Sequence, residues 1–281
     1  MDYVDAFLTQ NGLAGRVFCE PYAGGASVAL ALLERGSVAR CILIERDPLI
    51  YAFWKAVIDA PDELCELIDT TPITIRERAR QRGYLSLQRP RGHDLAVLGF
   101  AGLFLNRCNY SGILDAGPIG GREQASRYLL DCRFDRLRLC QQVMRVALMR
   151  SRIQVRFGDG LRFLQALNTR RQRGKVVVYV DPPYVRQGHR LYRHHYVESD
   201  HRRLARLLDH SFFPWIVTYD NEPLVHEMFS RQRIVPILLN YAVKQTRLAD
   251  ELLVSNRPLP APLYMDHRGK QVDVLLSRRA R

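Results

Sequence analysis

Short apolar runs alternate with longer stretches of helical composition at the start of the chain. The runs 16–20 (RVFCE) and 41–45 (CILIE) have the length and composition of buried strands. The stretches 26–35 (ASVALALLER) and 47–57 have the composition of helices. Strand, turn, helix, strand and helix in this order predict the opening of a parallel, doubly wound α/β sheet.

Runs of strand length return after residue 150. They lie at 153–157, 175–180, 215–219, 234–241 and 251–255, with a weaker candidate at 272–276. The intervening residues 61–150 are rich in arginine, helical in composition and broken by Gly-Pro and Gly-Gly pairs. We therefore predict one α/β domain with a doubly wound, mixed seven-stranded sheet built from residues 1–60 and 151–281. Residues 61–150 are predicted to form a mostly helical insertion.

The charge of the chain is strongly basic and unevenly placed. The 281 residues carry a formal net charge of +13, and only 4 of the 42 basic residues are lysine. Residues 1–70 hold 5 basic and 11 acidic side chains, whereas residues 71–281 hold 37 and 18. An extended basic surface favours a polyanionic partner such as nucleic acid. Codon usage that favours arginine is the alternative, but it would act evenly along the chain.

Several classes of protein are excluded by composition. No apolar run approaches the roughly 18–20 residues of a membrane span, and the N-terminus has no secretory signal pattern. The six cysteines form no CxxC pair, and the eight histidines have no metal-binding spacing. We expect a cytoplasmic protein without a metal site and without a membrane partner.

The run 176–180 (VVVYV) ends in Asp181-Pro182-Pro183-Tyr184. Ligands of open α/β sheets bind outside the carboxyl ends of strands. Because proline has no N–H, this turn offers hydrogen-bond acceptors, namely the Asp181 carboxylate and the Pro182 carbonyl, beside the flat face of Tyr184. Such a turn suits a planar group with an amino donor, as in an amino-substituted nucleobase. An Asp-Pro turn with a core tyrosine is the structural alternative.

The first apolar run leads into a glycine-containing turn. Its residues are Glu20, Pro21, Tyr22, Ala23, Gly24 and Gly25. Paired glycines between a strand and a helix let a ligand approach the backbone and the helix N-terminus. Glu45, at the end of the second run, is in the position of the acid that binds the ribose of an adenosine-type ligand. Asp47 is the alternative for that role, or a helix N-cap.

Taken together, EPYAGG (20–25), IERD (44–47) and DPPY (181–184) closely resemble the motifs of the Dam-like, D12-class N6-adenine DNA methyltransferases. Their order also matches, and the resemblance runs from about residue 16 to residue 255. It implies a Rossmann-like methyltransferase fold with a DNA-recognition insertion, S-adenosylmethionine as cofactor, and transfer to N6 of an adenine flipped out of double-stranded DNA. The DPPY residues would be catalytic, with Asp181 also near the cofactor.

The same resemblance assigns further residues. Phe157 and Asp159 belong to a turn that contacts the adenine of S-adenosylmethionine in the family. The segment 104–112 (FLNRCNYSG) is similar to the family's DNA-recognition segment, and 117–121 (GPIGG) continues it. The implied DNA contacts are Asn106, Arg107, Tyr110 and Ser111, joined by Arg186, Arg190, Tyr192 and Tyr196 from the loop after DPPY.

Other functions stay open at the level of sequence. No Pro-Cys pair occurs, which argues against cytosine-C5 chemistry through a cysteine nucleophile. An RNA adenine methyltransferase would use the same motif, whereas a protein-glutamine methyltransferase would more usually have asparagine in place of Asp181. Family members also carry a Gly-Gly-Lys or Gly-Ser-Lys segment upstream of EPYAGG. No lysine precedes Glu20 here, so a DNA-binding relative with impaired cofactor binding is a further alternative. The target site, the oligomeric state and a restriction endonuclease partner are not determined.

Overall fold

A computed structural model of the protein describes residues 2–169, 174–186, 188, 193–241, 247–260, 264–265 and 271–272. Arg190, Tyr192 and most of the strand expected at 272–276 lie outside the described residues. Within the described residues no helix is long and apolar enough to cross a membrane.

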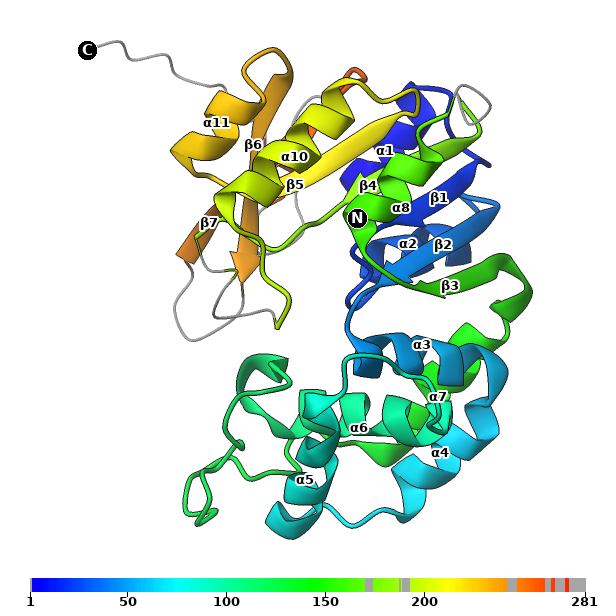
Figure 1. The fold of residues 1–281 in the computed structure, drawn as a ribbon, viewed down its shortest axis with the longest axis vertical. Coiled ribbons are helices and arrows are strands. Elements are labelled where there is room, and N and C mark those ends of the chain that lie inside the picture. The colour runs from blue at the N-terminus through cyan, green and yellow to red at the C-terminus, as the bar shows by residue number, and fades with distance from the viewer. Residues whose placement is uncertain are drawn as a thin grey trace.

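Seven strands of the described chain form one mixed sheet in the order β3-β2-β1-β4-β5-β7-β6 (Figure 1). Strands β1 to β5 are parallel to one another, and β7 runs antiparallel to both β5 and β6. Their bounds are Val17–Glu20, Arg40–Glu45, Ile153–Phe157, Val176–Val180, Trp215–Asp220, Arg233–Tyr241 and Arg247–Ser255, and a separate pair comprises β8 (Tyr264–Met265) and β9 (Gln271–Val272). This sheet confirms the predicted fold class.

Alternate side chains of the strands enter two separate hydrophobic cores. Val177 and Tyr179 of β4 pack with α1 (Asp2–Gln10), α2 (Ser27–Glu34) and α3 (Pro48–Asp59). Val178 and Val180 pack on the other face with α8 (Gly160–Leu167), α10 (Glu198–Asp209) and α11 (Pro223–Met228). Helices on both faces explain why VVVYV is buried throughout, as a strand at the centre of a parallel sheet should be.

The chain between β2 and β3 holds α3 and a further group of helices, drawn below the sheet in Figure 1. These are α4 (Pro61–Thr70), α5 (Ile75–Arg82), η1 (Gly83–Ser86), α6 (Leu95–Cys108), η2 (Tyr110–Gly112), α7 (Arg136–Ala147) and η3 (Arg150–Arg152). Residues 113–135 form turns rather than helix, so the middle of the chain is less helical than its composition indicated. Buried side chains of α4, α6 and α7 belong to the same hydrophobic cluster as α1 and α2. The division into domains at residues 60 and 150 therefore stays a prediction.

Helix α6 lies against α3 at two glycines. A Cβ atom on Gly99 would lie 2.7 Å from the Ala52 carbonyl oxygen and 2.7 Å from the Phe53 Cα. A Cβ on Gly102 would lie 2.9 Å from the Leu49 carbonyl oxygen. Because these are backbone atoms, they cannot move aside by a change of rotamer. The two glycines therefore set the distance between α3 and α6.

We expect Gly99→Ala to lower the free energy of unfolding by about 2 kcal/mol or more, because the added methyl group overpacks the contact between the two helices. Gly83→Ala is the matched control, since Gly83 is exposed, has φ −55° and would place its Cβ more than 4 Å from other atoms. The control should be neutral or gain about 0.4–1 kcal/mol. Urea denaturation measures both, and equal stabilities of the two variants would contradict the packing argument.

Candidate active site

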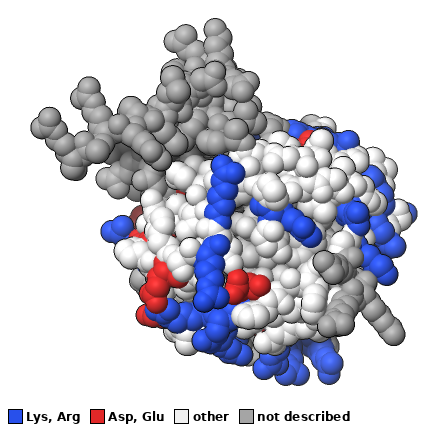
Figure 2. All heavy atoms as spheres, turned by 90° about the horizontal axis from the view of Figure 1, so that it is seen from above, with Lys and Arg blue, Asp and Glu red and all other residues white. Residues whose placement is uncertain are grey.

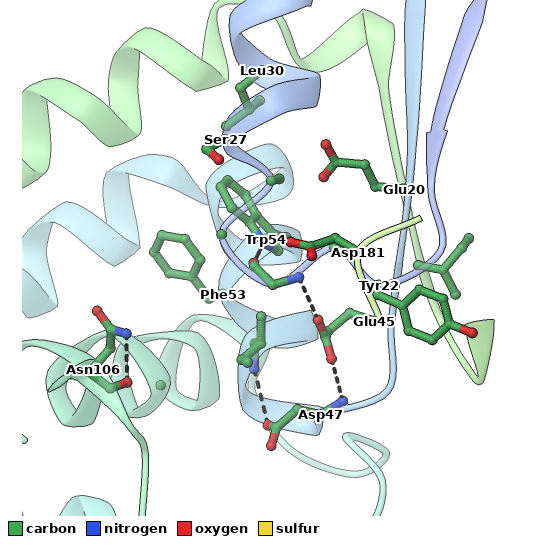
Figure 3. Close-up of a pocket in the computed structure, with 18 of the residues that line it drawn as sticks. Glu20, Tyr22, Ser27, Leu30, Glu45, Asp47, Phe53, Trp54, Asn106 and Asp181 are labelled. Carbon is green, nitrogen blue, oxygen red and sulfur yellow. Dashed lines mark hydrogen bonds between the residues drawn. The ribbon is translucent and has the colours of Figure 1, made fainter. Parts of the chain in front are cut away.

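The carboxyl ends of the central strands open into a cavity of about 830 Å³. Strands β1 and β4 are neighbours, and the chain winds outward from them in opposite directions, which is the point where open α/β sheets bind ligands. Side chains from β1, β2 and the turn after β4 line one side, and α6 with the following loop lines the other. Figure 3 shows Glu20, Glu45 and Asp181 on the side of the sheet, and Asn106 across the cavity from them.

The turn between β1 and α2 is held in an uncommon backbone conformation. Gly24 has φ 46° and Ala26 has φ 47°, both in the left-handed region. The Gly24 carbonyl accepts a hydrogen bond from Trp54 Nε1 at 2.8 Å, and the Gly24 N–H donates to Glu45 Oε2 at 3.0 Å. Sequence reasoning missed Trp54, whose buried indole is fixed by this bond. All six residues of EPYAGG line the cavity.

Glu45, at the end of β2, and Asp47, two residues later, have different hydrogen-bond partners. Glu45 Oε1 accepts the N–H groups of Arg46 and Asp47, each at 2.8 Å, while Oε2 accepts the Gly24 N–H. Burial raises the pKa of Glu45 to about 7, although these N–H bonds oppose the rise. Asp47 caps α3 through Leu49 N and forms a buried ion pair with Arg193 at 2.7 Å. Asp47 is thus the helix N-cap that its position allowed.

Glu20 ends β1 inside the cavity wall, with 4% of its surface exposed. Its Oε1 accepts the Ala29 N–H at 2.8 Å. Burial raises the pKa of Glu20 to about 8, with the Ala29 N–H bond opposing the rise and the nearby charge of Asp181 adding to it. At neutral pH, Glu20 is therefore mostly protonated in the folded protein.

The turn after β3 contributes one of its two predicted residues to the cavity. Asp159 lines the cavity and caps α8 by accepting the Arg162 N–H at 3.0 Å. Phe157 does not line it; its ring packs edge-on against Tyr51, with centroids 5.3 Å apart. Gly160, which sequence reasoning missed, also lines the cavity. A Cβ there would lie 2.3 Å from the Pro21 carbonyl oxygen, so only glycine fits between the two turns.

The DPPY segment divides between the cavity and the protein interior. Asp181 and Pro183 line the cavity, whereas Pro182 and Tyr184 do not. Asp181 Oδ1 accepts the Thr218 hydroxyl at 2.8 Å, and Tyr184 donates its hydroxyl to Glu251 Oε1 at 2.8 Å. Although Asp181 opens onto the cavity, burial within its walls raises the pKa of this carboxyl to about 6. The Thr218 bond opposes this rise and the Glu251 charge adds to it.

The predicted DNA-recognition segment meets the same cavity at the end of α6. Asn106, Arg107 and Ser111 line it, whereas Tyr110 is 60% exposed outside it. Burial lowers the pKa of Arg107, and the neighbouring Arg133 and Arg138 lower it further. The Nε atom of Arg107 is buried and has no hydrogen-bond partner among the described residues.

A buried polar clamp holds the loop that follows α6. Asn109 is fully buried and accepts Arg78 Nε at 2.6 Å, while its own amide donates to the Leu114 carbonyl at 2.7 Å. Arg78 also donates to the Ala116 carbonyl at 2.6 Å. The clamp fixes a loop in which Ser111 has φ 53°, so this part of the cavity wall is rigid.

The end of the loop after DPPY also reaches the cavity. Tyr196 lines it and shares a hydrogen bond with Tyr22, with 2.8 Å between the two hydroxyl oxygens. Arg193 connects this loop to Asp47 and to the Leu85 carbonyl. Arg186 is exposed and lies outside the cavity, 3.9 Å from Glu222. Tyr196 is therefore placed beside the predicted cofactor turn rather than on an outer surface.

The mixed sheet, parallel through β1–β5 and with a cavity at the carboxyl ends of its central strands, defines a Rossmann-like α/β fold. A sequence model described as D12 class N6 adenine-specific DNA methyltransferase matches residues 4–243. The chain therefore belongs to the D12 class N6 adenine-specific DNA methyltransferase family, which makes it a methyltransferase. No curated protein compared with the chain matches it.

Solved structures resemble the chain at the level of the fold. The rRNA methyltransferase aviRa from Streptomyces viridochromogenes is 15% identical, with a TM-score of 0.37, covering 90% of this chain and 81% of that one. A putative RNA methyltransferase from Pyrococcus horikoshii is 9% identical, with a TM-score of 0.39 and coverage of 90% and 79%. A putative methyltransferase from Escherichia coli is 10% identical, with a TM-score of 0.36 and coverage of 92% and 84%.

We expect Glu20 to make the folded protein less stable as pH rises. Its pKa is about 8 in the folded protein against an ordinary value of 4.5, so its contribution is fully present below pH 4.5 and is lost as pH rises through about 8. Glu20→Gln keeps an acceptor for Ala29 and removes the ionisation. Relative to this variant, the wild type should lose roughly a few kcal/mol between pH 4.5 and pH 8. Urea denaturation across this window measures the difference, and parallel stability profiles would contradict it.

Proposed function

We propose that the protein transfers a methyl group from S-adenosylmethionine to N6 of adenine in double-stranded DNA. The observation that carries this proposal is the position of Asp181. One of its oxygens is held by Thr218, and no donor among the described residues reaches the other, which belongs to the cavity. That cavity is also lined by the EPYAGG turn, Glu45 and Asp159.

The residues of the sheet edge fit the proposed cofactor. Glu45 Oε2 accepts a single N–H, so it has a lone pair for a ribose hydroxyl. Gly24 and Ala26, in the left-handed conformation, bring the backbone of the turn to the cavity. By family resemblance, Asp159 would contact the adenine. When bound, S-adenosylmethionine supplies a methyl group already activated by the sulfonium.

Asp181 has a simple task in this mechanism. The N6 lone pair of adenine is delocalised into the ring, which makes the amino group a poor nucleophile. The Asp181 carboxylate would accept one N6 hydrogen, turn the lone pair toward the methyl group and take up the proton that N6 loses once it carries the methyl. The sequence offered the Pro182 carbonyl as the second acceptor, but Pro182 does not line the cavity. Positioning of this kind contributes up to about 7–11 kcal/mol in well-oriented reactions. A stacked base cannot reach a residue inside a cavity, so the target adenine must leave the duplex, at a cost of a few kcal/mol.

Support for a nucleic-acid substrate comes from local charge rather than from net charge. Figure 2 shows basic side chains spread over the end of the molecule that is uppermost in Figure 1, away from α4–α7. Such a spread by itself marks no single binding surface. Arg107 is different, because it lines the cavity, two further arginines lie close by, and its Nε has no hydrogen-bond partner in the described part of the chain. A phosphate or a flipped nucleotide would supply the missing acceptor.

The direct test is to incubate the protein with S-adenosylmethionine and unmethylated plasmid DNA, or RNA of the same sequence, and to identify the methylated nucleoside by mass spectrometry. N6-methyldeoxyadenosine from DNA is expected. Methylation of RNA alone would identify an RNA adenine methyltransferase. DNA binding without cofactor binding in calorimetry would identify a relative that has lost catalysis.

Asp181→Ala should abolish methyl transfer while leaving DNA affinity within about threefold, because the change removes an N6 acceptor and no phosphate contact. Asp69→Ala, an exposed acid on α4 away from the cavity, is the matched control and should keep full activity. In the wild type, kcat at saturating cofactor should fall as pH drops below about 6, where Asp181 becomes protonated. Asp181→Asn cannot ionise and should lose this acid limb. Near-normal turnover of Asp181→Ala would exclude the proposed mechanism.

Arg107→Ala should weaken binding to the target DNA sequence by about 1–3 kcal/mol. Long-read sequencing of methylated DNA identifies this target sequence. Arg150→Ala is the control, since Arg150 is exposed on η3 outside the cavity. Fluorescence anisotropy at several salt concentrations separates two roles. A greater loss on target than on random duplex indicates sequence readout. Equal losses, with a salt slope reduced by about 1, indicate a phosphate anchor, and no loss on either duplex would contradict a DNA contact.

A further inference from the structure

Two buried polar side chains lie directly behind the DPPY segment, one on β5 and one on β7. Thr218 is 5% exposed and Glu251 is 4% exposed. Neither lines the cavity. Each forms a 2.8 Å hydrogen bond to a side chain of DPPY, Thr218 to Asp181 and Glu251 to Tyr184. Buried polar groups are costly unless they are hydrogen-bonded, so these contacts restrict both partners strongly.

The register of the sheet produces the first contact. Val180 of β4 is paired with Val217 of the parallel strand β5, so Thr218 follows beside Asp181. The Thr218 hydroxyl lies 2.8 Å from Asp181 Oδ1 and 3.4 Å from the Val180 carbonyl oxygen. A hydroxyl has one proton, and the shorter bond to the carboxylate is the stronger of the two. This bond fixes the rotation of the carboxylate, which determines where Oδ2 points within the cavity.

The antiparallel strand β7 produces the second contact. Glu251 is paired with Asp220 at the same edge of the sheet. Glu251 accepts the Tyr184 hydroxyl, while the Asp220 carboxylate accepts the N–H groups of Val185 and Arg186 at 3.0 and 2.9 Å. The side chain of Tyr184 is therefore anchored to the middle of β7, and the backbone that follows it is anchored to the end of β5.

We propose that Thr218 and Glu251 are positioning residues for methyl transfer, which hold the Asp181 carboxylate and, through Tyr184, the DPPY turn in the orientation that the target base requires. This inference rests on the proposed function of the cavity. It adds two residues that do not touch the substrate and act through Asp181 and Tyr184.

The two residues act on the ionisation of Asp181 in opposite directions. The Thr218 hydroxyl stabilises the ionised carboxylate and lowers its pKa, whereas the charge of Glu251 raises it. Glu20 on β1 and Tyr179 on β4 also interact with the Asp181 charge. The other titratable or charged side chains that line the cavity are Tyr22, Glu34, Glu45, Arg46, Asp47, Arg107, Arg145, Asp159, Arg193, His194 and Tyr196. Thr218 and Glu251 also act on Tyr179, but burial raises the pKa of Tyr179 well above its ordinary value, so shifts of the acid limb near pH 6 are assigned to Asp181.

The experiment measures kcat against pH at saturating cofactor and DNA. Thr218→Val removes the hydroxyl at nearly constant volume, so the acid limb should move up by about one pH unit. Its kcat should fall about 10- to 100-fold, with the KM for DNA changed less than threefold. Thr218→Ser restores a hydroxyl and should restore the wild-type limb. Glu251→Gln keeps an acceptor for Tyr184 but removes the charge, so the limb should move down while most of kcat remains. Glu251→Ala should lose kcat.

A second measurement needs neither substrate nor turnover. Titration of the Asp181 carboxyl carbon by ¹³C NMR, assigned by its loss in Asp181→Asn, should show the same opposite shifts in folded Thr218→Val and Glu251→Gln. An unmoved Asp181 titration in both variants would overturn the inference. If the wild type methylates no adenine, the proposed function fails, and the NMR shifts still decide whether Thr218 and Glu251 control this carboxylate. The inference would also be overturned if Thr218→Val lost kcat and Thr218→Ser, which restores a hydroxyl, lost it to the same extent.

Discussion

The site depends on one electrostatic constraint, which is that acids accumulate at a single edge of the sheet. Within the described chain, each parallel strand ends in an acid or is closely followed by one: Glu20, Glu45, Asp159, Asp181 and Asp220. Like charges in a partly desolvated cavity are unfavourable unless each is protonated or hydrogen-bonded. The structure uses both solutions. Burial raises the pKa values of Glu20, Glu45 and Asp181, and all five acids accept hydrogen bonds from backbone N–H or hydroxyl donors.

The same hydrogen bonds give the site its shape. Glu45 holds the EPYAGG turn through Gly24, and Trp54 holds that turn from the opposite side. Asp220 holds the backbone after DPPY, and Asp47 fixes the end of the following loop through Arg193. The carboxylates that would otherwise repel one another thereby hold the surrounding turns in place through hydrogen bonds. Such fixed points are what catalysis by positioning requires, since small displacements of the reacting groups are costly.

The fold and the location of the site could be predicted from the sequence because their signals are local. The apolar run of β4 and the DPPY segment are continuous in sequence, and parallel strands place their carboxyl ends at one edge. The partners of these motifs could not be predicted, because they come from distant parts of the chain. Thr218 and Glu251 lie 37 and 67 residues from the side chains they hold. Their positions near the ends of apolar runs were a usable signal, but sequence does not give the strand order that brings them to Asp181 and Tyr184.

The close contact between α3 and α6 sets the distance between the two walls of the cavity, one at the sheet edge and one at the end of α6. Helix α3 begins at the Asp47 cap, two residues after Glu45, and α6 ends beside Arg107. Gly99 and Gly102 let α6 approach the backbone of α3, so the two helices pack in direct backbone contact. The wall with the proposed cofactor residues and the wall with the proposed DNA residues are therefore joined through backbone contact rather than through flexible side chains. A fixed distance between these walls would let the donor and acceptor of a methyl group meet without rearrangement of the helices.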